Sequence, residues 1–196
     1  MKIPTKKECY KLLKKYSVPL NVIRHAEDVC RVSLFIGERM KKRGEKINLN
    51  LLEAASLLHD IDKIHTLNNG RHGIMSCDIL KKERFNAIAR FALIHVLHAI
   101  LSTRTMPKTW EEKIFYYADR RVNPEGIVSA KNRFDYLRQQ YGTKDKKIMK
   151  MINEAEPKVK RLEKEIFSKI KLKPEEINKL TAAEQYGKRL LQNTWR

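Results

Sequence analysis

Along most of this chain, apolar residues recur at the three- and four-residue spacing of amphipathic helices. One face of a long helix is marked by Val22, Ala26, Val29, Ser33 and Ile36. Gly44 lies just beyond the basic end of this segment, where a helix would stop. Capping boxes at Thr5–Glu8 and Thr109–Glu112 predict the starts of two more helices. Because no segment alternates apolar and polar residues over a useful length, the pattern predicts an all-α fold.

The middle of the chain is divided by polar caps and turn residues. Asn50, with Glu53 three residues later, is expected to cap the apolar segment LLEAASLLHD. The Asn68-Asn69-Gly70 stretch is typical of a turn. The same reasoning predicts further helices over about 72–82, 86–101 and 126–141.

After Gly142 the chain becomes strongly charged, but it keeps a helical apolar stripe. The stripe consists of Ile148, Met151, Ile152, Ala155, Val159, Leu162 and Ile166. It predicts an amphipathic helix, which Pro157 is expected to kink, and a short last helix capped at Thr181–Glu184. We therefore predict a core over residues 1–142 and a basic helical extension over 143–196, packed on or next to it.

The charge of the chain favours an anionic ligand. Lys and Arg total 42 of the 196 residues, Asp and Glu total 23, and the formal net charge is +19. Such a field attracts phosphate esters, nucleotides or nucleic acid, although a solvated basic surface has the same composition. No apolar run approaches the ~20 residues that span a bilayer, and residues 1–15 lack the apolar run of a signal peptide. We expect a cytoplasmic protein with no membrane partner.

The three cysteines argue against cysteine chemistry. Cys9, Cys30 and Cys77 are odd in number and none forms a C-x-x-C pair, which argues against a disulfide framework and a zinc–thiolate site. Each is expected to pack as a small apolar residue.

Histidines and aspartates on apolar helix faces carry the candidate chemistry. His25, His59 and His95 each have apolar neighbours at helical spacing, as does Asp119. One inward-facing histidine is ordinarily a core residue, but burying several beside Asp60 and Asp119 is costly unless they share a partner. A shared metal ion explains both carboxylates. Imidazole and carboxylate donors suit borderline divalent ions such as Fe, Mn, Co, Ni or Zn.

These residues also match a known family. The segments VIRHAEDV, LLEAASLLHDIDK, RHGIMSCDIL, FALIHVLHAIL and EEKIFYYADRRV give the order H…HD…H…H…D over about residues 6–141. This order resembles the HD superfamily of metal-dependent phosphohydrolases, which are all-helical bundles. The resemblance implies one or two divalent ions (Fe, Mn, Co, Ni, Zn or Mg). A first ion would be held by His25, His59, Asp60 and Asp119, and a second by His72 and His95, with Asp60 as the bridge.

One residue departs from the family pattern, and others extend it. The chain reads HDIDK where relatives commonly read HDIGK, so Asp62 either supports the ligands or is an exposed residue at a helix end. Lys63 matches a lysine that meets substrate phosphate in the family, although it also fits an ordinary solvated lysine. Arg120 or Arg121 is expected at the pocket mouth as a phosphate-binding fork. His98, one turn after His95, is expected to line the pocket.

The resemblance predicts hydrolysis of a small phosphate ester, such as a nucleotide, by a metal-activated water that Asp60 orients and Lys63 assists. A di-iron oxygenase on the same fold needs the same ligands, so that alternative stays open. A third reading is a nucleic-acid-binding module with a structural metal, which would bind through Lys146, Lys147, Lys150, Lys158, Lys160 and Arg161. Because glutamates alternate with these cations, a solvated face or a homodimer contact fits the segment at least as well.

Overall fold

The structure is a computed structural model that describes residues 2–66 and 71–180, and it confirms the all-α prediction. In chain order the elements are α1 (Lys6–Lys15), α2 (Leu20–Lys42), α3 (Leu49–Leu58), η1 (Lys63–His65), α4 (Ile74–Lys82), α5 (Asn86–Ile94), η2 (Leu97–Leu101), α6 (Trp110–Asp119), β1 (Val122–Asn123), β2 (Gly126–Ile127), α7 (Ala130–Gln140), η3 (Gly142–Lys144), α8 (Lys146–Ile170) and η4 (Pro174–Leu180).

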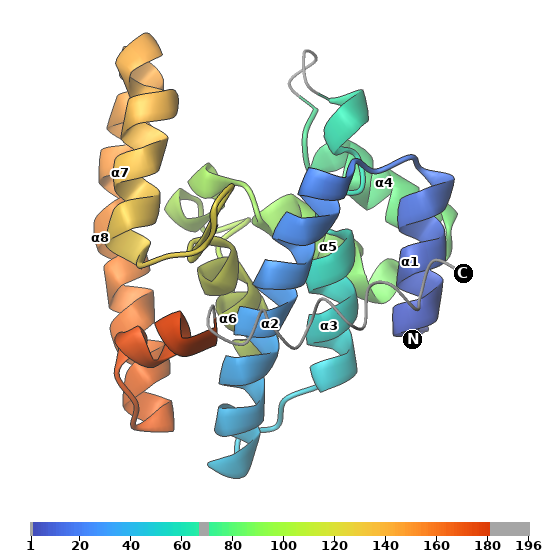
Figure 1. The fold of residues 1–196 in the computed structure, drawn as a ribbon, viewed down its shortest axis with the longest axis horizontal. Helices are drawn as coiled ribbons and strands as arrows, with labels where there is room; N and C mark the ends of the chain where they lie inside the picture. Colours follow the sequence, from blue (N-terminus) through green and yellow to red (C-terminus); the bar gives the residue numbers. More distant parts are fainter. Residues whose placement is uncertain (1, 67–70, 181–196) are drawn as a thin grey trace.

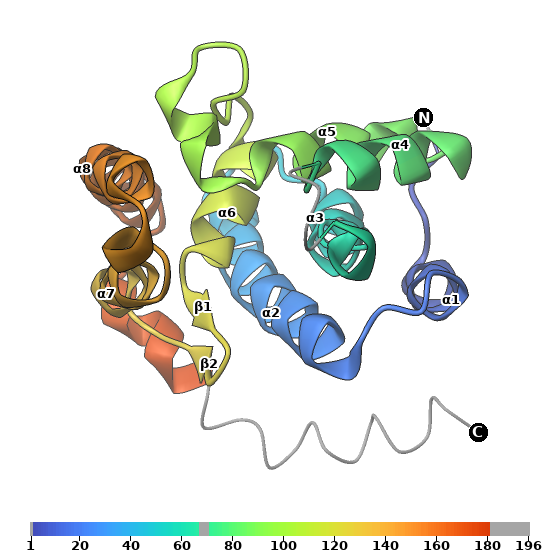
Figure 2. The same cartoon turned by 90° about the horizontal axis from the view of Figure 1, so that it is seen from above.

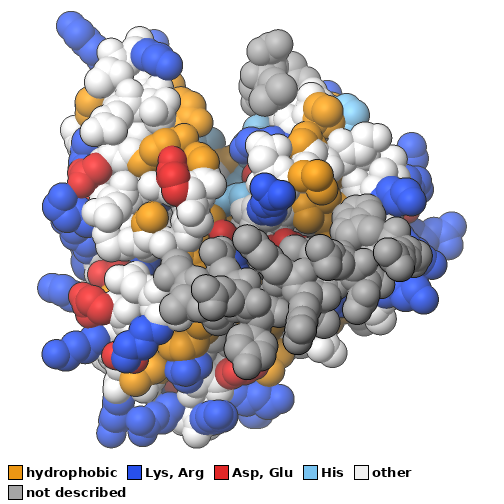
Figure 3. Space-filling view, viewed as in Figure 1, with side chains coloured by type: hydrophobic (Ala, Val, Ile, Leu, Met, Phe, Trp, Pro, Cys, Tyr) orange, Lys and Arg blue, Asp and Glu red, His pale blue; other side chains and the backbone are white. Residues whose placement is uncertain are grey.

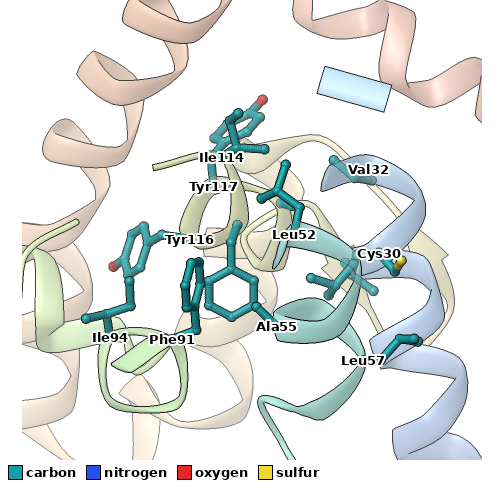
Figure 4. Close-up of a cluster of buried hydrophobic side chains, with 14 of the residues drawn as sticks. Cys30, Val32, Leu52, Ala55, Leu57, Phe91, Ile94, Ile114, Tyr116 and Tyr117 are labelled. Atoms are coloured by element: carbon teal, nitrogen blue, oxygen red, sulfur yellow. The ribbon is translucent and has the colours of Figure 1, made fainter. Parts of the chain in front are cut away.

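Helix α2 is the centre of the bundle. Helices α3 and α6 pack against it, α4 and α5 lie beyond α3, and α1 closes that side (Figure 1). Helices α7 and α8 form a pair on the opposite side of α2, with the β1–β2 hairpin between α7 and α2 (Figure 2). The apolar faces meet in one core, part of which Figure 4 shows with side chains of α2, α3, α5 and α6, among them Val32, Leu52, Phe91 and Tyr116.

Several predicted helix starts are confirmed by their caps. The Thr5 hydroxyl accepts from the Glu8 amide while the Glu8 carboxylate accepts from the Thr5 amide, and Thr109 caps α6 through the Glu112 amide. The expected cap of α3 is wrong by two residues. Asn48, rather than Asn50, accepts from the Leu51 amide, so Asn50 lies in the first turn of the helix.

The single helix predicted over 86–101 is also wrong, because α5 ends at Ile94. The His95 ring donates from Nδ1 to the Ala92 carbonyl at 2.6 Å, and this is the carbonyl that the Val96 amide would use in a continuing helix. Val96 is extended, and the chain resumes as η2. The break turns the His95 side chain towards the interior of the bundle.

The segment after α6 forms a short antiparallel hairpin that the sequence did not predict. Val122 pairs with Ile127 and Asn123 pairs with Gly126, whose φ of +119° suits glycine. Two-residue strands are too short to show alternation. Helix α7 therefore begins at Ala130, capped by Ser129, and not at Gly126.

Helix α8 has the apolar stripe predicted for it, and it continues through Pro157. Its buried side chains join the same core as those of α2 and α6, and it packs along α7. The division of the chain at residue 142 stays a prediction. The expected turn at Asn68–Gly70 and the expected helix from Thr181 lie outside the described residues. Among the helices of the described part, none is long and apolar enough to cross a bilayer.

Candidate metal centre

Histidine side chains gather at the floor of a hollow between the α7–α8 pair and the rest of the bundle (Figure 3). The candidate ligands come together because the backbone ends several helices at the same place. His59 follows the last residue of α3, His95 follows the last residue of α5, and Asp119 is the last residue of α6. The C-terminal end of a helix carries a partial negative charge, so three such ends favour a cation between them.

The first group of donors is formed by His25, His59 and Asp60, with Asp119 beside it. One donor atom from each of the first three lies within 4.8 Å of the others. The His59 Nδ1 donates to the Ser56 carbonyl at 2.8 Å, which leaves Nε2 as an acceptor that is buried without a hydrogen-bond partner. Asp119 Oδ1 lies 3.1 Å from His25 Nε2.

The second group shares Asp60 with the first and adds His72 and His95. Asp60 Oδ1 lies 3.1 Å from His72 Nε2 and 3.2 Å from His95 Nε2, and the two Nε2 atoms are 2.8 Å apart. Because His95 donates from Nδ1 to a carbonyl, its Nε2 lone pair faces this group. The structure thus brings all six predicted ligands into one cluster. Their role as metal ligands stays a prediction.

Both central carboxylates are ionised in this surrounding. Burial raises the pKa of Asp60, but its interactions with His59, His72 and His95 outweigh burial and hold that pKa well below the usual range. Burial likewise raises the pKa of Asp119, and the Arg120 guanidinium and His25 reverse the effect. Burial lowers the pKa of His59 to about 4, so its ring is neutral and its Nε2 lone pair is available to a metal ion.

His72 differs from His59 in its protonation when no cation is present. Burial lowers its pKa, but its hydrogen bonds to Asp60 and Asp62 dominate and raise that pKa to about 9. The protonated ring donates from Nδ1 to Asp62 Oδ1 at 2.9 Å, while Nε2 faces Asp60. In the metal-free protein the imidazolium therefore supplies the positive charge that the carboxylate needs.

Asp62 is fully buried and supports His72, which decides between the two alternatives that the sequence left open. Its carboxylate also accepts from the backbone amides of Gly73, at 2.9 Å, and Ser76, at 3.0 Å. Those amides belong to the start of α4, so Asp62 caps that helix from a distant turn. The pKa of Asp62 is lowered because these hydrogen bonds and His72 outweigh its burial.

Gly73 and Ser76 are parts of the site that the sequence analysis missed. Gly73 has a φ of +82°, and a Cβ placed on it would lie 2.7 Å from the Ala92 carbonyl oxygen and 3.3 Å from His95 Cε1. Only glycine fits both this backbone conformation and this close approach. The signal available in the sequence was a glycine directly after a candidate ligand.

The open side of the cluster is formed by His25, His72 and Lys63, whose side chains are 20%, 27% and 41% exposed. Lys63 Nζ lies 3.5 Å from Asp60 Oδ2 and 3.2 Å from His72 Nε2. It is thus a cation at the edge of the cluster with access to solvent, and its predicted contact with a substrate phosphate stays a prediction.

The arginines after Asp119 do not reach the mouth of the hollow, contrary to expectation. Arg120 is only 3% exposed, pairs with Asp119, donates to the His95 carbonyl and stacks on Tyr116. Arg121 is buried as well and donates to the Val128 carbonyl and the Tyr117 hydroxyl. Arg120 follows the last residue of α6, and its side chain turns back so that the guanidinium forms an ion pair with Asp119. Its predicted contact with substrate is not supported by this placement.

His98 and His65 lie outside the cluster. His98 is exposed on η2, and no hydrogen bond or ring contact among the described residues joins it to the six. Its predicted contact with substrate stays a prediction. His65 ends η1 and is exposed.

The donor set fits a divalent cation. Among the described residues, His59 Nε2 is buried without a hydrogen-bond partner, and the nearest partners of Asp60 Oδ1 are the ring nitrogens of His72 and His95. The imidazole and carboxylate donors form two groups that share Asp60, and such donors suit borderline divalent ions. The arrangement can therefore hold one cation in each group.

Comparisons with known proteins agree with this arrangement. The HD domain family matches residues 22–123, just over half of the chain. A tRNA (cytidine(56)-2'-O)-methyltransferase of Picrophilus torridus is 29% identical over 177 residues, which cover 85% of this chain and 47% of that protein. An uncharacterized protein of Methanocaldococcus jannaschii is 26% identical over 153 residues, which cover 72% of this chain and 83% of that protein. The chain thus spans about half the length of the first relative. No solved structure was found to match it.

Proposed function

This chain belongs to the HD domain family, and we propose that it is a metal-dependent phosphohydrolase that acts on a small phosphorylated substrate such as a nucleotide. One observation supports this most strongly: two groups of donors share Asp60, and His59 Nε2 in the first group is buried with no hydrogen-bond partner among the described residues. Buried polar atoms normally have partners, so the lone pair of His59 Nε2 points to a cation at this position.

In this proposal His25, His59, Asp60 and Asp119 hold one divalent ion, and Asp60, His72 and His95 hold a second. When bound, such ions lower the pKa of water and neutralise charge on phosphate oxygens. Arg120 keeps Asp119 ionised and fixes its orientation, and Asp62 fixes the orientation of the His72 ring through the hydrogen bond from its Nδ1.

Asp60 and Lys63 carry the remaining roles in this proposal, which are orienting the water and binding the phosphate. Asp60 is buried and central to both groups, so it orients the attacking water by accepting its hydrogen bond. Lys63, at the open edge, binds the phosphate and stabilises the negative charge that develops on it. The net charge of +19 attracts an anionic ester to the hollow from a distance.

The test is a phosphate-release assay on nucleotides and generic phosphate esters, with Mn, Co, Ni, Mg and Fe supplied in turn to metal-stripped protein. We expect metal-dependent release that does not require dioxygen. If no ester is hydrolysed with any ion, while the iron form consumes oxygen, the di-iron oxygenase replaces the phosphohydrolase.

RNA is a second candidate partner, because one relative is named as a tRNA methyltransferase. The outer face of α8 offers a surface for it, since six cations of that face are exposed: Lys146, Lys147, Lys150, Lys158, Lys160 and Arg161. Lys150 and Lys160 are partly offset by Glu154 and Glu156. Phosphate contacts would make binding strongly salt-dependent.

A matched pair of charge reversals tests this surface. A double variant with Lys146→Glu and Lys147→Glu should weaken binding of a tRNA transcript and reduce its salt dependence. A double variant with Lys81→Glu and Lys82→Glu carries the same charge change on exposed positions of α4 and serves as the control. Equal binding by both variants would argue against α8 as the RNA surface.

A further inference from the structure

Arg133, on α7, is a half-buried arginine without a counter-ion among the described residues. Its one hydrogen bond there runs from Nη1 to Asn123 Oδ1 at 3.2 Å, and its guanidinium lies over the Tyr136 ring at 5.5 Å. Its Nε is buried and has no hydrogen-bond partner in the described part of the chain. In contrast, Arg138 on the same helix pairs with Asp135 and Glu156.

The location of Arg133 connects it to the candidate metal centre. Its hydrogen-bond partner Asn123 lies in β1, four residues after Asp119, and α7 packs on that strand. Burial lowers the pKa of Arg133, and the charges of Asp119 and Arg120 act on it in opposite directions. The hydrogen bond to Asn123 fixes the guanidinium beside β1, the strand that follows Asp119. Asp119 cannot serve as its counter-ion, because it is already paired with Arg120 and His25.

The orientation of the guanidinium matters as much as its charge. Asn123 occupies Nη1, and the other edge, formed by Nε and Nη2, has no hydrogen-bond partner among the described residues. These two N–H groups form the fork that binds two oxygens of a phosphate or carboxylate. A polar group held in this way with one edge unused is expected to have a ligand.

We propose that Arg133 is a substrate-binding residue whose free guanidinium edge binds the phosphate group of the ester. This inference rests on the proposed function and deepens it, since it adds a second cation to the substrate site. Lys63 stands beside Asp60 and His72, whereas Arg133 is held by Asn123 in β1, the strand that follows Asp119. A phosphate over the cluster would then be held between one cation from the bundle and one from the α7–α8 pair.

The experiment is titration calorimetry of inorganic phosphate with the metal-loaded full chain. Arg133→Met removes the charge and keeps much of the apolar volume, and we expect it to weaken phosphate binding about 10–100-fold, the scale of losing hydrogen bonds to a charged group. Lys131→Met removes one charge from an exposed position of the same helix, 75% exposed, and should bind phosphate within about twofold of the unmodified protein. Metal content should be unchanged in both variants.

Equal phosphate affinity in Arg133→Met and Lys131→Met would overturn the proposal. If Arg133→Met does not fold, Arg133→Gln decides by the same criteria, since its amide can keep the hydrogen bond to Asn123. The outcome is separable from that of the proposed function. Phosphate binding that depends on Arg133 in a protein without hydrolytic activity would retain the anion site and reject the phosphohydrolase. If the protein hydrolyses phosphate esters and Arg133→Met binds phosphate as tightly as the unmodified protein, the phosphohydrolase stands and the role of Arg133 is rejected.

Discussion

The two groups of the candidate centre are held in place by different means. In the first, His25, His59 and Asp119 stand on or at the ends of α2, α3 and α6, three helices that pack on one another in the core. In the second, His72 precedes α4, and His95 stands where α5 breaks. His59 and His95 each follow the end of a helix and donate to a carbonyl of it, so the groups differ chiefly in His72, which lies before α4 and is held by its hydrogen bond to Asp62.

This difference suggests how the two groups should respond to change. A residue positioned by packing tolerates the loss of one neighbouring hydrogen bond. His72, however, lies outside the helices of the described residues and depends on Asp62. We therefore expect the second group to bind its cation more weakly and to lose it more easily.

Removing the residue that both groups share should have the largest effect. Asp60→Ala should lower phosphate release to background and abolish binding of both ions, because each group loses a carboxylate donor. Metal analysis after dialysis, together with the phosphate assay, checks this. Asp78→Ala, at an exposed carboxylate on α4, is the control and should behave like the unmodified protein. If the Asp60→Ala variant keeps both ions, Asp60 is not the ligand that the two groups share.

Lys63→Ala should have the next largest effect and should separate substrate binding from metal binding. We expect catalytic efficiency to fall roughly 10–1000-fold, the scale of losing one charged stabiliser, while the metal content stays normal. Steady-state kinetics and metal analysis on the same preparation measure both quantities. Loss of metal together with activity would mean that Lys63 supports the ligands instead of meeting substrate.

Asp62→Asn tests the dependence of the second group directly. Without the carboxylate, His72 loses its ionised hydrogen-bond partner, and affinity for the second ion should fall about 10–100-fold. The first ion should bind as before. A competition titration with a metal-sensitive chelator resolves the two affinities. If the affinities for both ions fall equally, the two groups are not independent and the distinction drawn above is wrong.

The smallest effect should come from salt, which leaves the sequence unchanged. Raising the salt concentration from about 0.05 to 0.5 M shortens the Debye length several-fold, so KM for an anionic ester should rise roughly 2–10-fold. Cation affinity at the buried donors should change far less. Parallel measurements of KM and of metal retention at each salt concentration check the contrast. If KM does not change with salt concentration, the net positive charge of the chain does not contribute to substrate capture.

The sequence predicted which residues would come together but not how they are supported. Each of His25, His59 and His95 has apolar neighbours one turn away, and this local pattern already directs a side chain inwards. Whether Asp62 is buried depends on where the segment with His72 returns to it, ten residues later. No local pattern contains that information.

Other errors have similar causes. The apolar residues of FALIHVLHAIL keep helical spacing through the break at Val96, so the pattern does not reveal the break. The break arises because the His95 ring, and not the Val96 amide, donates to the Ala92 carbonyl. Arg120 is polar and follows the end of a helix, which favours exposure, yet Asp119 and the His95 carbonyl hold it inside. Arg133 resembles any other cation of an amphipathic helix until the hairpin places Asn123 beside it.

Gly73 has a further consequence for anyone who designs or evolves variants of this protein. Its missing side chain is what lets the start of α4 approach the Ala92 carbonyl and the His95 ring. In a library selected for turnover, this position should reject every other residue, even though it contacts neither cation nor substrate. A design method that scores each position by the ligands it touches would vary Gly73 freely, and would discard half of the centre without altering any of its ligands.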